Sequence, residues 1–153
     1  MRNIIDEYGR NAGKIWEALN NNGSLPQTKL IKNTKLSNDE FHSAIGWLAR
    51  ESKITKQDRA QISRYSLGET NLTTKIGGDA GRVWKTLSTW GENDVSNISK
   101  YTRIEADEVY AALGWLARED KIEVKYGKNQ KTMFRLKNGN PIAGRKQEKN
   151  KLM

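Results

Sequence analysis

The stretch Gly46-Trp47-Leu48-Ala49-Arg50-Glu51-Ser52-Lys53-Ile54 recurs as Gly114-Trp115-Leu116-Ala117-Arg118-Glu119-Asp120-Lys121-Ile122. The same offset of 68 residues relates Ala12-Gly13-Lys14-Ile15-Trp16 to Ala80-Gly81-Arg82-Val83-Trp84 without a gap. Over residues 9–54, 19 of the 46 residues are identical to the residue 68 positions later. Two unrelated amphipathic helices would not agree so closely, so the chain contains one module twice.

Each copy begins with a helical pattern. Apolar residues recur at i, i+3, i+4 and i+7, which predicts an amphipathic helix. We expect Asn11 and Asp79 to be the N-caps of these two helices. Gly23 and Gly91 are expected to follow their last residues, because glycine readily adopts the conformation that ends a helix.

Two further helices are expected in each copy. A short second helix is predicted over residues 26–33 and 95–101, where Pro or Asp stands at the start. Residues 37–40 read Ser-Asn-Asp-Glu, a capping box that opens a third helix. Copy 2 has Glu105 in place of the capping serine, so its third helix is capped less conventionally.

A β-hairpin is predicted after the third helix. In the second copy apolar and polar residues alternate over 121–126, a turn is expected at 127–130, and the alternation resumes up to Leu136. The matching segment of the first copy, 53–67, alternates poorly, so its hairpin is the weaker prediction.

Three helices followed by a hairpin is the layout of a winged helix-turn-helix domain. The sequence resembles a small family of winged helix-turn-helix proteins in bacteria and archaea. The resemblance is carried by Ala-Gly-x-x-Trp in the first helix and by Gly-Trp-Leu-Ala-Arg-Glu-x-Lys-Ile from the third helix into the hairpin, and it covers residues 4–67 and 72–136. It implies an α+β, mainly α fold of two tandem domains, and it implies nucleic-acid binding. It carries no catalytic residues.

We expect three segments along the chain. Residues 1–68 form copy 1, residues 69–137 form copy 2, and residues 138–153 form a flexible basic tail. A unit of this length can bury a modest core of its own, so each copy is expected to do so.

Composition excludes several classes of function. The 153 residues include 27 Lys and Arg against 18 Asp and Glu, one His and no Cys. The chain therefore has no disulfide and no thiolate zinc site, and one histidine cannot build a multi-histidine metal centre. No nucleophile–base pair or cofactor loop stands at a recognisable spacing, so we expect neither an enzyme nor a cofactor.

The apolar segments are too short for a membrane protein. The longest nearly apolar run, residues 110–117, is far below the roughly 20 residues that cross a bilayer. The first residues reach carboxylates after two apolar residues, which does not suit a secretory signal. We expect a cytoplasmic protein without a membrane partner, associated with the nucleoid if it binds DNA.

Clustered basic residues in both copies point to a polyanionic partner. Neutralised phosphates release counterions, which favours binding at low salt. Lysines on a hairpin can also serve only to keep an edge strand soluble. The candidate nucleic-acid-binding residues are Lys29, Lys32, Lys35, Lys56, Arg59, Arg64, Lys100, Arg103, Lys125, Lys128, Lys131, Arg135, Arg145 and Lys146.

The start of the third helix does not suit base recognition. In a groove-reading winged helix this turn contacts base edges. Here it carries Asn38, Asp39 and Glu40 in copy 1, and acidic residues at the corresponding positions of copy 2. Carboxylates repel phosphates, although they also interact favourably with a helix N-terminus. We therefore expect sequence-tolerant binding of double-stranded DNA through the hairpins, the second helix and the tail.

Gly46-Trp47 and Gly114-Trp115 place a glycine inside each third helix. Such a glycine costs about 1 kcal/mol relative to Ala, so another backbone is expected to approach closely. That backbone could belong to the first helix, to the sister copy or to a partner protein. Trp90 corresponds to Asn22 of copy 1 and is not needed by the core of the module. We therefore treat Gly46, Trp47, Trp90, Gly114 and Trp115 as a candidate partner interface.

Three aromatic or imidazole side chains have simpler interpretations. Trp16 and Trp84 fall on the apolar stripes of their helices and are expected to pack in the core. His42 lies away from the buried stripe of its helix and is expected at the surface.

Alternatives to DNA binding remain open at this point. RNA or ribosome binding would use the same charges. A protein-interaction adaptor in a transcription or translation complex would use the acidic third helix and the Gly-Trp pairs.

Overall fold

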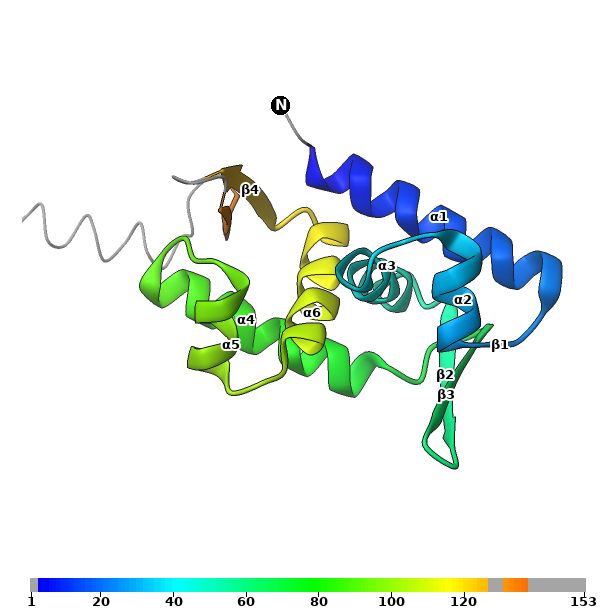
Figure 1. Cartoon of the computed structure of the whole chain (residues 1–153). Helices are drawn as coiled ribbons and strands as arrows, with labels where there is room; N and C mark the ends of the chain where they lie inside the picture. Colours follow the sequence, from blue (N-terminus) through cyan, green and yellow to red (C-terminus); the bar gives the residue numbers. More distant parts are fainter. Residues whose placement is uncertain (1–2, 127–130, 138–153) are drawn as a thin grey trace, which may run out of the picture.

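The computed structural model describes residues 3–126 and 131–137, and Figure 1 shows its helices and strands. Copy 1 contains α1 (Ile4–Asn22), β1 (Leu25–Pro26), α2 (Gln27–Thr34), α3 (Asn38–Arg50), β2 (Ile54–Arg59) and β3 (Ile62–Leu67). Copy 2 contains the π-helical turn η1 (Thr73–Gly77), α4 (Gly78–Trp90), α5 (Val95–Thr102), α6 (Ala106–Arg118), β4 (Ile122–Tyr126) and β5 (Thr132–Leu136). The fold is α+β and mainly α, as predicted, with three helices and a hairpin in each copy.

The first helix of each copy starts earlier than the sequence predicts. Asn3 caps α1, and its Oδ1 accepts a hydrogen bond from the backbone N–H of Ile5 at 3.0 Å. The predicted N-cap Asn11 is wrong, because this residue lies buried inside α1. Asp79 is likewise not a cap and lies in the first turn of α4. The ends agree with the prediction, since Gly23 ends α1 at a φ of 73°.

The second helices α2 and α5 lie where they are predicted, and hydrogen bonds at the start of the third helices match the predicted capping. The backbone N–H of Ser37 donates to Glu40 Oε1 at 2.8 Å, and the N–H of Glu40 donates to Ser37 Oγ at 3.1 Å. In copy 2 the N–H of Glu105 donates to Glu108 Oε1 at 2.9 Å, the equivalent of the bond from Ser37 N–H to Glu40 in copy 1. In both third helices the N–H of the capping residue is therefore bonded to the glutamate three residues on.

Both predicted hairpins are present, and the one in copy 1 is the longer. Strand β3 pairs antiparallel with β2 from Ile54↔Leu67 to Arg59↔Ile62, and β1 pairs with the other edge of β3. Only Ile54 and Tyr65 of this hairpin are buried, which explains its poor alternation: the hairpin projects beyond the core. Strands β4 and β5 form the second hairpin, whose turn at 127–130 lies outside the described residues.

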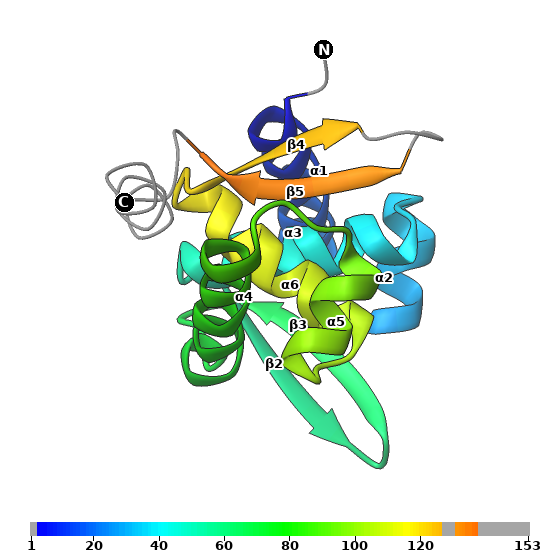
Figure 2. The same ribbon diagram turned by 90° about the vertical axis from the view of Figure 1, so that its left-hand side faces the viewer.

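Helices α3 and α6 cross each other at the centre of the molecule (Figures 1 and 2). A Cβ atom on Gly46 would lie 1.7 Å from the carbonyl oxygen of Ala111, and one on Gly114 would lie 1.8 Å from that of Ser43. Of the three neighbours considered for these glycines, the structure shows the sister copy. The exchange of equivalent contacts is that of an isologous interface, here within one chain.

Each hydrophobic core includes residues of the other copy. Ile4 and Tyr8 at the start of α1 belong to the core of copy 2, and Ile76 and Ala111 belong to the core of copy 1. The expectation that each copy buries a core of its own therefore needs correction. Each core is built mainly by one copy and completed by its sister.

The hairpins lie on opposite sides of this crossing. Figure 2 shows β2–β3 at the bottom of the molecule and β4–β5 at the top. Among the described residues, no helix is both long and apolar enough to span a bilayer.

Candidate nucleic-acid interface

The middle parts of the two third helices, which correspond to the helices that read DNA in winged helix domains, are covered. In those domains the third helix enters the major groove. In this chain the middle of α3 is buried, including Ser43 and Gly46, because α6 lies across it. The same holds for Ala111 and Gly114 of α6. The middle of each helix is therefore unavailable to a groove. The first turns stay exposed and contact each other, since Asn38 Nδ2 donates to Asp107 Oδ1 at 2.7 Å.

Reciprocal side-chain contacts join the ends of the crossing helices. Arg50 Nε lies 3.1 Å from Glu119 Oε2, and Arg118 Nε lies 3.0 Å from Glu51 Oε2. Each guanidinium also lies over a tryptophan ring of the other copy, Arg50 at 5.6 Å from the centroid of Trp115. The rings themselves pack on glycines, with Trp47 meeting the Cβ position of Gly9 at 3.1 Å. The arginines, glutamates and tryptophans of the repeated motif are thus used within the chain.

His42 is another side chain that the crossing covers. Its side chain is 14% exposed, and its Nε2 lies 3.4 Å from Asp107 Oδ2 of copy 2. The prediction of a surface histidine is therefore wrong. Burial lowers the pKa of His42, and the carboxylate of Asp107 opposes this shift.

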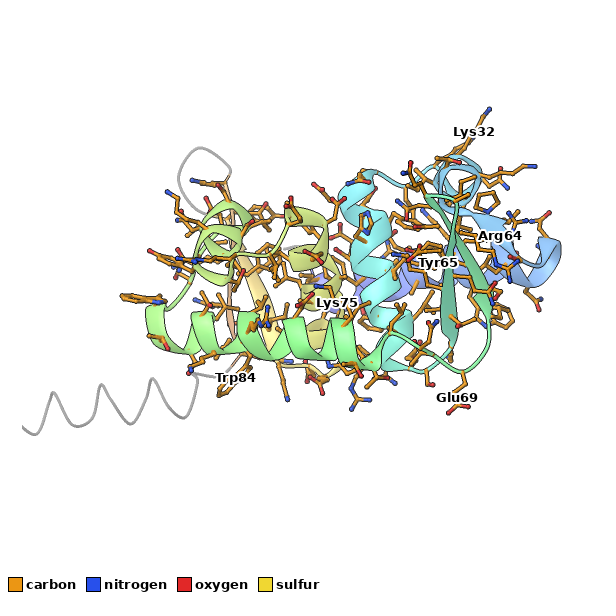
Figure 3. The ribbon with its side chains drawn as sticks, turned by 90° about the horizontal axis from the view of Figure 1, so that it is seen from below. Lys32, Arg64, Tyr65, Glu69, Lys75 and Trp84 are labelled. Carbon is orange, nitrogen blue, oxygen red and sulfur yellow. The ribbon has the colours of Figure 1, made fainter. Side chains whose placement is uncertain are left out.

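Basic side chains gather on copy 1 without carboxylate partners. Helix α2 and the hairpin β2–β3 lie at the same end of the molecule, where Figure 3 shows Lys32 extending outward and Arg64 on the neighbouring strand. All the side chains of this group are exposed, and no ion pair joins any of them to a carboxylate of the described residues. We call this group the copy 1 cationic surface: Lys29, Lys32, Lys35, Arg59 and Arg64.

Local contacts hold the hairpin against α2. Strand β1 leads directly into α2, and Pro26 of β1 is paired in register with Arg64. The hydroxyl of Tyr65 donates a hydrogen bond to Gln27 Oε1 at 3.3 Å. Burial, aided by Asp58, raises the pKa of Tyr65, so the hydroxyl remains a donor at all physiological pH values. Arg64 is therefore fixed beside the first turn of α2.

Lys56 differs from the rest of the predicted copy 1 residues. Its Nζ lies 3.8 Å from Asp58 Oδ1 and 6.0 Å from the ring centroid of Tyr65. Lys56 lies in β2, is half-buried, and is less available to phosphate than Arg59 and Arg64 of the same hairpin.

The predicted cations on the second hairpin are already paired. Lys125 Nζ lies 3.8 Å from Glu92 Oε1, and Arg135 Nε lies 2.8 Å from Glu123 Oε1. Lys131 Nζ lies 2.5 Å from Asp94 Oδ2, and this hydrogen bond holds the pKa of Asp94 below its usual value. The predicted cations of the second hairpin are therefore paired with carboxylates, whereas most of those of copy 1 are not. The similar sequences of the two copies do not indicate this difference.

Lys100 on α5 and Arg103 directly after it are exposed and have no carboxylate partner in the described part of the chain. They correspond to Lys32 and Lys35 of copy 1. Three further predicted residues, Lys128, Arg145 and Lys146, lie outside the described residues.

The tryptophans follow three different patterns. Trp16 is 41% exposed, so the prediction that it packs in the core is wrong. Trp84 is half-buried against the core of copy 2. Trp90 is 63% exposed, and its ring is stacked on Tyr101 with centroids 5.6 Å apart and planes 11° apart. The sequence could have indicated this pair, because both rings replace asparagines of copy 1, Asn22 and Asn33.

Acidic and basic residues also cluster beside the crossing. Lys75 Nζ lies 3.0 Å from Asp79 Oδ2 and 2.6 Å from Glu108 Oε2. The pair with Glu108 raises the pKa of Lys75 and lowers that of Glu108, so both groups of this pair are charged at neutral pH. Within the described part of the chain, no group of three His, Cys, Asp or Glu side chains is placed to hold a metal ion.

Comparison with known proteins gives two matches. The model of the family described as "Winged helix-turn-helix domain (DUF2582)" matches residues 1–64 and again 71–136. An uncharacterized protein of Methanocaldococcus jannaschii is 47% identical over 53 residues, which are 33% of this chain and 74% of that protein. No solved structure matches the chain.

Proposed function

Because the chain belongs to the winged helix-turn-helix family described as DUF2582, we propose that it is a non-enzymatic protein that binds nucleic acid, preferentially double-stranded DNA. Winged helix domains are generally binding domains rather than enzymes. The observation that carries this proposal is the copy 1 cationic surface, where five exposed cations have no carboxylate partner among the described residues.

The chemistry of this surface suits the phosphate backbone. Lysine and arginine side chains contact phosphate oxygens, and every cation that neutralises a phosphate releases condensed counterions. A cation already paired with a carboxylate contributes less, because the attraction is already satisfied by its partner. Copy 1 is therefore the main contact surface, and the second hairpin contributes less.

Binding is expected to tolerate different sequences. Base edges are read by groups that enter a groove. Here the middle of each candidate reading helix is covered by the other, and the exposed first turns carry acidic residues. The remaining contacts reach the backbone, which is the same for every sequence. Sequence-tolerant binding suits a chromatin-type or transcription-associated role. The proposed location is the nucleoid in the cytoplasm.

The test is a fluorescence anisotropy titration of a labelled 20-base-pair duplex at several salt concentrations. The copy 1 variant carries Lys29→Gln, Lys32→Gln and Arg64→Gln. We expect weaker binding and a shallower dependence of log K on log salt, by roughly 0.9 for each phosphate that the variant no longer neutralises. Two duplexes of unrelated sequence should bind with similar affinity.

A matched variant of copy 2 controls for net charge. It carries Lys125→Gln, Lys131→Gln and Arg135→Gln, so it removes the same number of positive charges, but from residues that are paired with carboxylates. Its affinity and salt slope should change less than those of the copy 1 variant. Equal effects of the two variants would mean that only net charge matters, and no binding at low salt would refute the proposal.

Two other classes of partner are outcomes of the same experiment. Tighter binding of an RNA duplex than of DNA would assign the surface to RNA. Failure to bind either duplex would favour a protein adaptor within a transcription or translation complex.

A further inference from the structure

We propose that the stacked rings of Trp90 and Tyr101 form a platform for an unpaired base of single-stranded nucleic acid. This inference concerns copy 2 and does not depend on the duplex-binding proposal for copy 1. It starts from an aromatic pair that the fold leaves in solvent.

The pair consists of two nearly parallel rings, and each residue is more than half exposed. The centroids are 5.6 Å apart, the planes differ by 11°, and the side chains are 63% and 51% exposed. A third flat ring can extend such a stack. Bases of a single strand offer their faces in this way, whereas bases inside a duplex are stacked on each other and offer only their edges, and a blunt duplex exposes a base face only at its two ends.

The fold does not require these rings. Copy 1 builds the same helix, loop and second helix with Asn22 and Asn33 at the equivalent positions. Asn22 serves there as a local cap, donating its side-chain N–H to the carbonyl of Ala18 at 2.8 Å. Two large exposed aromatics therefore distinguish copy 2 from copy 1 without contributing to the shared architecture.

Charges beside the rings suit a phosphate backbone. Lys100 and Arg103 lie on or directly after the helix that carries Tyr101, and both are exposed without a carboxylate partner in the described chain. The acidic residues next to Trp90, Glu92 and Asp94, are neutralised by lysines of the second hairpin at 3.8 and 2.5 Å. Two cations without a carboxylate partner in the described chain therefore stand within two residues of Tyr101.

The exposed chain neighbours of the two rings are polar or small and not apolar, which favours a base over a protein partner. The exposed residues adjacent to the rings in the chain include Thr89, Gly91 and Lys100. Protein interfaces usually surround their aromatic anchors with further contacts that exclude water. A stacked base needs only a ring face and a cation for its phosphate.

The platform also lies far from the copy 1 cationic surface. Helices α4 and α5 lie on the left of Figure 1, and α2 with the hairpin β2–β3 lies on the right. Single-strand and duplex binding can therefore be measured as separate properties of the full chain.

The experiment compares labelled dT15, U15 and a blunt 20-base-pair duplex with the full-length protein and its variants. Replacing both rings, Trp90→Ala with Tyr101→Ala, should weaken single-strand binding by about 5- to 140-fold, the range expected for one stacked base. Trp90→Phe with Tyr101→Phe keeps flat rings and should retain most of the affinity. The matched control, Asn22→Ala with Asn33→Ala in copy 1, should bind as the wild type does.

Spectroscopy adds a readout that a purely structural role would not change. Stacking of a base on Trp90 should quench part of the tryptophan fluorescence, and Trp90→Phe should abolish that part while single-strand binding persists. Similar affinity for dT15 and U15 would mean that the platform recognises the face of the base and not the sugar. A preference for one of them would indicate whether the platform binds single-stranded DNA or single-stranded RNA.

Three results would overturn the proposal. They are single-strand affinity within about twofold of the wild type after both rings are removed, an equal loss of duplex affinity in the same variant, and concentration-dependent self-association that disappears with the rings. The last result would assign the rings to a second copy of the chain. Loss of duplex binding in the copy 1 variant alone would leave this inference intact.

Discussion

Replacing Gly46 by alanine tests whether the crossing of α3 and α6 determines the stability of the molecule. The added Cβ would lie 1.7 Å from the carbonyl oxygen of Ala111 and 2.6 Å from its carbon. Real contacts of this kind are not shorter than 3.0 Å, so the helices must move apart by at least 3.0 − 1.7 = 1.3 Å. The obstacle is backbone in the middle of a helix, which cannot rotate away as a side chain can.

The magnitude follows from two opposing effects. Alanine favours the helix over glycine by about 1 kcal/mol. Overpacking of a core typically costs about 1–3 kcal/mol, and a gap of about 0.5–1 Å already removes a quarter to a half of the dispersion energy of the atoms that separate. A displacement above about 1 Å along the whole crossing lies at the upper end of this range. We expect Gly46→Ala to lower the free energy of unfolding by about 2 kcal/mol or more.

Gly13→Ala is the matched control, because Gly13 is also inside a helix and nothing lies within 4 Å of its Cβ position. This variant should gain up to about 1 kcal/mol from helix propensity alone. Urea unfolding of both variants, followed by circular dichroism, gives the comparison through the midpoint at constant m-value. Equal stability of the two variants would refute the close crossing, and so would a more stable Gly46→Ala protein.

Three further predictions concern other parts of the molecule. Residues 1–68 and 69–137, produced separately, should associate on mixing, because each core includes residues of the other copy; two monomeric halves with full cooperative transitions would contradict this. The unfolded chain takes up a proton near the ordinary pKa of His42, 6.5, whereas the folded protein does so only at lower pH. Stability should therefore fall as pH decreases from about 7 to about 5, and His42→Gln should flatten this part of a curve of stability against pH. Ala60 and Gln61 form the hairpin turn at φ values of 50° and 65°, which suit Asn and Gly. The double substitution Ala60→Asn with Gln61→Gly should raise the free energy of unfolding by up to about 1 kcal/mol and therefore raise the thermal midpoint. An unchanged or lower midpoint would contradict this prediction.

Local features of the fold can be predicted because their causes lie within a few residues. The capping box at Ser37, the terminating Gly23 and the alternation in β4 each depend on neighbours in the chain. The start of α1 is predicted too late because Asn11 stands directly before the repeated apolar stripe, whereas Asn3 caps the helix earlier in the chain. That Asn11 is buried and that Gly9 packs on the ring of Trp47 belong to the tertiary structure.

The candidate sites show the same division. The basic residues can be identified from the sequence, but their availability depends on which carboxylate lies nearby. Lys131 is neutralised by Asp94, which is 37 positions away in the chain, and no spacing rule connects them. The sequence marks Trp90 as unnecessary for the core, yet only the structure pairs it with Tyr101.

One winged helix-turn-helix module occurs twice, and this can be read from the amino-acid sequence because periodicity, capping and repetition are properties of short segments. The crossing of α3 and α6, and the different sets of unpaired cations on the two copies, emerge only in the folded molecule. Close packing and ion pairing depend on distances between residues that are far apart in the chain. Gly46 and Gly114 permit the close approach, and the rest of the fold brings the two helices together there.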